Sequence, residues 1–295
     1  MKITIKILAI VFILIFLVSC GSSGTGDTKT NFKTGSGGLK ISFFNNAPPD
    51  KIYPDSDFRI ILQLENNAAY DIIAGEISII GLDEKYFEVK PLKQSFPVLV
   101  GRSLLNPSGG KDHLEFEGKA KKLFQNAQSY RGNYFLKTKF KSTMEFSDTI
   151  CLSPRLYEIY DSGCTPQEKK GYSGQGAPLA ITDIELVAYP VGAGAKIEFR
   201  ARLKNLGNGM IDKIYLKDAK LGGGEFQKCE FQGSIIDTHE ALLSANKQET
   251  MLVCETTLTS SSSYETTLFF DFDYDYEMKE QHQLNLINPN AQSSW

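Results

Sequence analysis

The sequence contains very little histidine and almost no tryptophan. Its three histidines, His113, His239 and His282, are separated by 126 and 43 residues, and its one tryptophan is the last residue, Trp295. It also has no Cys-x-x-Cys motif. Metal-binding side chains usually occur at short, regular spacings, and acid–base catalysis commonly uses a histidine close to its partner. We therefore expect no metal site, no cofactor and no catalytic residues.

Two short motifs approach catalytic patterns without completing them. His239-Glu240 begins like a zinc-protease motif, but Leu243 stands where the second histidine is needed. Gly171-Tyr172-Ser173-Gly174-Gln175 resembles a nucleophile elbow, but it lacks the last glycine and lies in a predicted linker. Neither motif supports an enzyme.

A concentrated positive charge is missing as well. The chain has 32 lysines and arginines against 35 acidic residues, and cleavage after residue 19 would remove two of the lysines and no acid. Proteins that bind nucleic acid need a strongly basic face. The sequence therefore predicts no nucleic-acid partner.

The N-terminus has the order of a secretory signal. Lys2 and Lys6 precede an apolar run of 12 residues, Ile7–Val18, and Leu17-Val18-Ser19-Cys20-Gly21 matches a lipoprotein cleavage site. About 20 apolar residues are needed to cross a bilayer as a helix. We therefore expect residues 1–19 to be removed, and Cys20 to carry lipid that holds the chain to the cell membrane or outer membrane. The alternatives are a signal peptide that ends beside a cysteine by chance and an uncleaved anchor.

Four more cysteines follow, and an even number outside the cytoplasm indicates disulfides. Three pairings are possible for Cys151, Cys164, Cys229 and Cys254. Proximity favours Cys151–Cys164 and Cys229–Cys254. Each closed loop would contribute roughly 3 kcal/mol in the chain-entropy model. A metal site is the weaker alternative, because the histidines are not suitably spaced.

The pattern of apolar and polar residues in the mature chain predicts β-strands and no convincing amphipathic helix. Phe58–Leu64 and Ile197–Leu203 alternate apolar with polar residues, and short strands with Gly and Asn turns recur along both halves. We expect an all-β protein with two tandem immunoglobulin-like sandwiches. The expected divisions are 1–19 signal peptide, 20–38 lipidated Cys20 with a Gly/Ser/Thr tether, 39–160 first sandwich, 161–178 linker, 179–288 second sandwich and 289–295 polar tail.

Two local matches point to a duplicated module. Leu64-Glu65-Asn66 in the first half matches Leu203-Lys204-Asn205 in the second. Ser129-Tyr130 and Ser263-Tyr264 both precede a strong late strand. The spacings of 139 and 134 residues agree within the variation expected of loops.

Several segments resemble known surface proteins. Asn205-Leu206-Gly207-Asn208-Gly209, after an alternating strand, resembles adhesion-type immunoglobulin-like repeats of archaeal and bacterial surface proteins. Asn46–Asp50, Asn106–Gly110 and Ser173–Pro178 resemble a group of uncharacterised archaeal membrane-anchored proteins. The resemblance covers most of the mature chain and implies fold class and location, without an activity.

Two strands carry runs of one charge. Asp271, Asp273 and Asp275 alternate with aromatic residues, and Lys137, Lys139 and Lys141 occupy the comparable strand of the first half. We interpret both runs as solvated faces; a cation site at the aspartates and a meeting of the basic with the acidic face are the alternatives.

These observations predict a non-enzymatic, lipid-anchored surface protein with a structural or adhesion-like role and a protein or glycan partner. The second hypothesis is an extracytoplasmic solute- or glycan-binding component. The least favoured one is an enzyme whose site assembles only in three dimensions.

Overall fold

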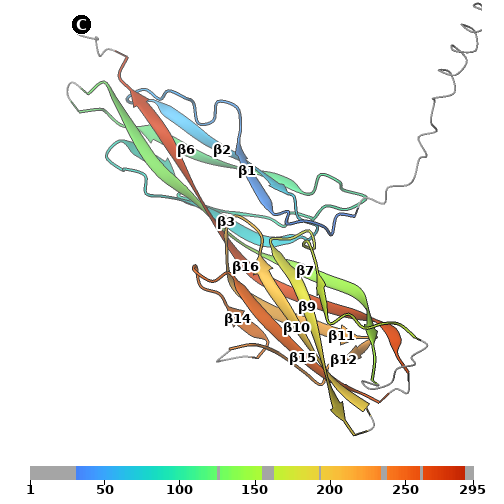
Figure 1. Cartoon of the computed structure of the whole chain (residues 1–295). Coiled ribbons are helices and arrows are strands. Elements are labelled where there is room, and N and C mark those ends of the chain that lie inside the picture. The colour runs from blue at the N-terminus through green and yellow to red at the C-terminus, as the bar shows by residue number, and fades with distance from the viewer. Residues whose placement is uncertain are drawn as a thin grey trace, which may run out of the picture. The chain divides into compact units, whose positions relative to one another are not determined.

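The computed structural model describes residues 31–124, 127–154, 163–192, 194–233, 238–259 and 262–289, and these contain sixteen strands and no helix (Figure 1). The all-β prediction is confirmed. The predicted signal peptide, Cys20 and most of the predicted tail lie outside the described residues. Within the described part, no helix is long and apolar enough to span a membrane.

The strands form three sheets in which neighbouring strands are antiparallel. The first has the order β1-β2-β6-β4, the second β13-β15-β10-β9-β8 and the third β12-β11-β16-β7-β3-β5, with β14 paired to β11. The strands are β1 (Leu39–Phe43), β2 (Asp57–Asn66), β3 (Ile72–Ile80), β4 (Phe87–Lys90), β5 (Lys93–Phe96), β6 (Lys111–Ala120), β7 (Ser129–Leu152), β8 (Lys169–Gly171), β9 (Leu179–Val191), β10 (Gly194–Asn205), β11 (Met210–Leu221), β12 (Gly224–Glu225), β13 (Lys228–Phe231), β14 (Glu240–Leu242), β15 (Glu249–Leu258) and β16 (Tyr264–Ile287).

The third sheet forms one layer of each of two sandwiches. The first sheet packs on one part of it, where Phe87 of β4 meets Tyr130 of β7. The second sheet packs on the other part, where Phe231 of β13 meets Phe272 of β16. The orders β1-β2-β6-β4 and β9-β10-β15-β13 correspond to strands A, B, E and D of an immunoglobulin-like sandwich. The corresponding C and F strands are β3 and β7 in the first sandwich, and β11 and β16 in the second.

Strands β7 and β16 each have 24 residues and pair along their whole length, from Ser129↔Ile287 to Leu152↔Tyr264. At about 3.3 Å per residue the pair is roughly 80 Å long. Strand β7 pairs with β3 as far as Ser142, and β16 pairs with β11 as far as Glu277. The rest of each long strand continues beside the other module, so each F strand extends to become the G strand of the other sandwich.

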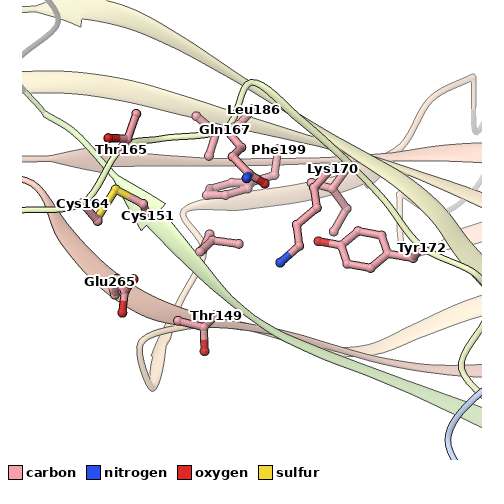
Figure 2. Close-up of a pocket in the computed structure, with 12 residues that line it drawn as sticks. Thr149, Cys151, Cys164, Thr165, Gln167, Lys170, Tyr172, Leu186, Phe199 and Glu265 are labelled. Carbon is pink, nitrogen blue, oxygen red and sulfur yellow. A yellow bond between two sulfur atoms is a disulfide. The ribbon is translucent and has the colours of Figure 1, made fainter.

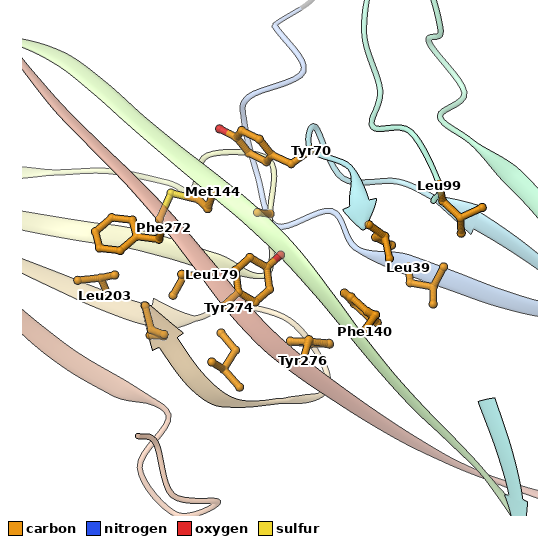
Figure 3. Packing of buried hydrophobic residues seen from close by; sticks show 14 of the residues in the cluster. Leu39, Tyr70, Leu99, Phe140, Met144, Leu179, Leu203, Phe272, Tyr274 and Tyr276 are labelled. Carbon is orange, nitrogen blue, oxygen red and sulfur yellow. The ribbon is translucent and has the colours of Figure 1, made fainter. Parts of the chain in front are cut away.

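One hydrophobic core runs through both sandwiches. Strand β2 buries Phe58, Ile60, Leu62 and Leu64, as the alternation predicts, and β10 does the same with its apolar residues. Figure 3 shows the region where the sandwiches meet, with Leu39 and Leu99 on one side and Leu179 and Leu203 on the other. Labelled residues of β7 and β16 in the same view are Phe140, Met144, Phe272, Tyr274 and Tyr276.

The matched asparagines have equivalent structural roles. Asn66 ends β2, accepts a hydrogen bond from Ala68 N and donates to Tyr70 O. Asn205 ends β10, accepts from Gly207 N and donates to Gly209 O. The same bonds at the same offsets support two related modules. Asparagine suits both places because its amide completes a turn directly after a strand.

Some segments differ from the expectation. The short strands expected late in each half are parts of two much longer strands, and the polar segment 277–283 stays extended because it pairs with β7. The expected linker 161–178 includes β8, and the tether's last residues lie against the fold: Lys33 pairs with Glu145 at 2.5 Å, and Gly35 forms a bridge with Gln175. In sequence, β7 lies within the expected first sandwich and β16 within the expected second, but the two strands pair with each other along their whole length.

Candidate functional site at the open edges of the sandwiches

The second sandwich is hollow between its two sheets on the side of β7 and β8. The cavity has a volume of about 220 Å³. In Figure 2, Lys170 and Tyr172 lie on one side, Thr149 and Glu265 on the other, and a disulfide at one end. We call this cavity the second mouth because it belongs to the second sandwich.

The second mouth combines an apolar interior with a polar rim. Its apolar side chains come from both sheets and are Ile150, Ile184, Leu186 and Phe199. Its polar side chains are Thr149, Thr165, Gln167, Lys170 and Glu265. The cavity can therefore offer both apolar contacts and hydrogen-bonding groups to a bound segment.

A small network fixes one side of the second mouth. The Tyr172 hydroxyl donates to Asp148 Oδ2 at 2.7 Å, and Lys170 Nζ lies 2.6 Å from the same oxygen. Burial, followed by the bond to Asp148, raises the pKa of Tyr172, so the phenol stays protonated. The network orients Tyr172 as a hydrogen-bond donor and leaves it without acid–base chemistry near neutral pH.

The disulfides have the pairing that the sequence favours. Cys151 is bonded to Cys164, with the Cα atoms 5.7 Å apart, and this bond holds the segment before β8 against the end of β7. Cys229 of β13 is bonded to Cys254, the residue opposite it on β15, and their Cα atoms are 4.1 Å apart. Disulfides of this kind are typical of proteins outside the cytoplasm.

The outer edge of β7 is open beside the second mouth. Beyond Ser142, no described strand pairs with β7 on the side away from β16. The Tyr70 hydroxyl covers one carbonyl by donating to Glu145 O at 2.8 Å. The edge Thr143–Leu152 contains no lysine or proline, two residues that natural proteins commonly use to block strand addition, and its only charged residues are Glu145 and Asp148.

A second hollow, the first mouth, occupies the equivalent side of the first sandwich. It lies between the end of β1 and the part of β16 that follows its pairing with β11. Most of its described lining residues are amides or aromatic residues: Phe43, Phe44, Asn45, Asn46, Asn133, Tyr134, Gln281, His282 and Gln283. Tyr134 is buried, its hydroxyl has no hydrogen-bond partner among the described residues, and burial raises its pKa.

His282 differs from the other two histidines in its surroundings. His113 and His239 are exposed, but His282 lies within β16 with its side chain 27% exposed. Its ring packs edge-on against Phe43, and its Nε2 lies 3.5 Å from Glu280 Oε2. The described residues that line this hollow include no serine, threonine or cysteine as a nucleophile.

The two charged runs come together at one pair of residues, where Lys141 Nζ lies 3.8 Å from Asp275 Oδ1 and both side chains stay exposed. Lys137 and Lys139 pair instead with Glu277, which lies just beyond the aspartate run, at 2.9 and 3.2 Å. Burial alone would raise the pKa of Glu277, but hydrogen bonds from the two lysines outweigh it and lower the pKa.

The predicted alternation of the aspartate strand is confirmed, since its four aromatic residues Phe270, Phe272, Tyr274 and Tyr276 are buried. The cation beside the aspartates is the Lys217 ammonium, 3.2 Å from Asp271 and 3.5 Å from Asp273. No group of three possible metal ligands occurs among the described residues.

Sequence reasoning did not find the second mouth, because it placed Cys164, Gln167, Lys170 and Tyr172 in a linker. The favoured bond between Cys151 and Cys164 was the available signal, since it ties that linker to a strand.

No family model and no curated protein sequence matches this chain. Three solved structures show low similarity. The PapD-like domain 7 of human CEP192 is 15% identical, with a TM-score of 0.18, and the match covers 42% of this chain and 81% of that one. The E. coli chaperone DraB is 11% identical, with a TM-score of 0.20, and covers 71% and 86%. The Salmonella enterica complex of the SafA pilin with the SafB chaperone is 11% identical, with a TM-score of 0.20, and covers 72% and 82%. At these scores the fold class rests on the strand order itself.

Proposed function

We propose that the protein is a lipid-anchored, extracytoplasmic protein that binds an extended segment of a protein partner at the second mouth. The observation that carries this proposal is the 220 Å³ cavity beside the open edge of β7. An added peptide strand gains main-chain hydrogen bonds from an edge, and alternate side chains enter neighbouring pockets. The second mouth offers both features within one short stretch.

The chemistry of the mouth favours a particular peptide. Ile150, Leu186 and Phe199 offer apolar contacts to one inward side chain. Glu265 on the rim is exposed and can pair with a positive charge beside it, whereas the Lys170 ammonium is already paired with Asp148. We therefore expect an extended segment with a central aliphatic or aromatic residue and polar flanks.

The location part of the proposal comes from the N-terminal sequence and the disulfides. Cys20 after a short apolar run supplies an anchor, and the two disulfides suit an oxidising compartment. Intact mass and detergent partitioning of the wild type and Cys20→Ala test it. We expect lipid on Cys20 and loss of membrane association in the variant; a variant that stays in membranes and keeps residues 1–19 contradicts the lipid anchor.

The binding part can be tested with a displayed library of random peptides, selected on the oxidised chain. We expect the selected peptides to lose at least tenfold in affinity, about 1.4 kcal/mol, with Ile150→Arg. Leu242→Arg, an exposed leucine on β14, is the matched control and should bind normally. Bound peptide should also slow amide exchange in β7 after Glu145. Peptides that bind Ile150→Arg as well as the wild type contradict this site.

The first mouth favours a second candidate function, binding of a polar solute such as a glycan. Its amides and exposed Phe44 match the hydrogen bonds and the apolar faces of a sugar. Tyr134→Phe removes one buried hydroxyl without changing shape, so glycan-array binding that depends on this mouth should weaken in that variant. Binding that is unchanged in Tyr134→Phe and in Phe44→Ala rules this site out.

A further inference from the structure

A loop between β5 and β6 presents two leucines to solvent. Leu104 is 76% exposed and Leu105 is 99% exposed, and Val98 and Val100, earlier in the same segment, are about half exposed. Exposed single leucines are common, but these two adjacent leucines and the two valines gather exposed apolar surface in one loop, and contiguous apolar surface can mark a contact with a protein or a membrane.

Backbone hydrogen bonds and a glycine hold the two leucines at the tip of this loop. Ser103 N donates to Asn106 O at 3.0 Å, and Asn106 N donates back to Ser103 O at 3.2 Å, so the leucines occupy the centre of a closed turn. Gly109 has a φ of +70°, and a Cβ there would lie 1.9 Å from Asn66 O. Arg102 N donates to Ala68 O at 2.8 Å, which fastens the base of the turn to the first sandwich.

The turn lies next to the point where the N-terminal segment joins the fold. The Arg102 guanidinium lies 5.7 Å from the centre of the Phe32 ring. Phe32 is twelve residue steps from Cys20, which can span at most about 43 Å when fully extended. A lipid on Cys20 would therefore keep this part of the first sandwich close to the bilayer.

The charge of the loop allows contact with a lipid surface. Val98–Gly110 contains one charged residue, Arg102, and no acid. Anionic headgroups would therefore attract the arginine and would meet no like charge in the loop. Interfacial apolar side chains enter only the outer 5–10 Å or so of the bilayer, which two leucines on a turn can reach.

We infer that Leu104 and Leu105 insert into the lipid surface that holds the chain at Cys20, and so fix the orientation of the sandwiches on the membrane. This inference rests on the lipid anchor proposed above. The lipidated N-terminus supplies the affinity, and the leucine turn supplies a second point of contact.

A tryptophan placed at the tip reports its environment, because the chain has only Trp295. In a Trp295→Phe background, Leu105→Trp is compared with Phe124→Trp in full-length protein reconstituted into phosphatidylcholine–phosphatidylglycerol vesicles. Phe124 is the matched control, since it is 69% exposed but follows the opposite end of β6. Flotation of the vesicles first shows whether the protein is anchored.

We expect Leu105→Trp to shift to shorter emission wavelengths and to lose fluorescence when the acyl chains are brominated near the headgroup, while Phe124→Trp does neither. Protein that floats without quenching of Leu105→Trp overturns the inference and leaves the anchor standing. Protein that does not float overturns the anchor and the inference with it. A blue shift that depends on protein concentration without lipid identifies a second copy as the occupant and also overturns it.

Discussion

Replacement of Asn66 by alanine should cost much more stability than the same change at Asn205. Asn66 is fully buried and makes three hydrogen bonds, from its Nδ2 to Tyr70 O and Leu99 O and from Ala68 N to its Oδ1. Asn66→Ala leaves the Tyr70 carbonyl and the Ala68 amide without these partners, whereas the Leu99 carbonyl keeps its hydrogen bond from Ile72 N. Since a buried unsatisfied group costs about 1–3 kcal/mol, we expect a loss of about 3–5 kcal/mol.

Asn205 makes three comparable bonds, to Gly209 O, Gln248 Oε1 and Gly207 N, but its surroundings are only partly buried. Water can replace part of what Asn205→Ala removes, so we expect a loss of about 1–2 kcal/mol. The difference between the two equivalent sites isolates burial, because the local hydrogen bonds within the turns are the same.

Guanidinium unfolding followed by tyrosine fluorescence and circular dichroism measures both losses. Asn67→Ala, in the same turn as Asn66, is the control and should change the free energy of unfolding by less than about 0.5 kcal/mol. The three variants should have equal dependence on denaturant, which would show that the unfolded states are alike. Equal losses at the two sites, or a loss below about 1 kcal/mol for Asn66→Ala, refute the reasoning.

Three further predictions concern the shared strands and the disulfides. Calorimetry should show one transition with equal calorimetric and van't Hoff enthalpies, because β7 and β16 belong to both sandwiches; two separated transitions would contradict this. The lowered pKa of Glu277 means that its ion pairs stabilise the fold above the ordinary glutamate pKa of 4.5 and lose that effect as the pH falls through the folded-state pKa. The stability difference between the wild type and Glu277→Gln should therefore shrink between pH 7 and pH 3, and a constant difference would show that the lysine pairs contribute nothing. Replacing Cys151 and Cys164 together by serine should cost about 3 kcal/mol, measured by denaturant unfolding, and unchanged stability would mean that this bond is absent in solution.

The alternating strands were predictable because their signal is local. Phe58–Leu64 and Ile197–Leu203 each repeat with a period of two, and burial follows that period. The asparagine turns were also visible, since the same three-residue match occurs at both strand ends. These features depend on neighbours in sequence, which is the information that a single chain carries most directly.

Local alternation in the sequence could not predict that β7 and β16 are continuous over 24 residues each. Glu277–His282 is polar and breaks the alternation, and it remains a strand because residues 134–139 lie opposite. The second mouth depends on the same non-local pairing, because β7 reaches it only by continuing past its own module. The charged runs gave a partial signal: Lys141 and Asp275 face each other across the middle of the long pair.

The exchange of G strands also determines where this chain can change in length. Side chains alternate between the two faces of a strand, so one inserted residue turns every later residue to the opposite face. In β7 or β16 such an insertion would move apolar residues out of two cores at once. Turns such as Gly222–Gly223 lie outside the long pair and belong to one sandwich only. Insertions and deletions should therefore be tolerated in such turns and rejected along the whole length of the two shared strands.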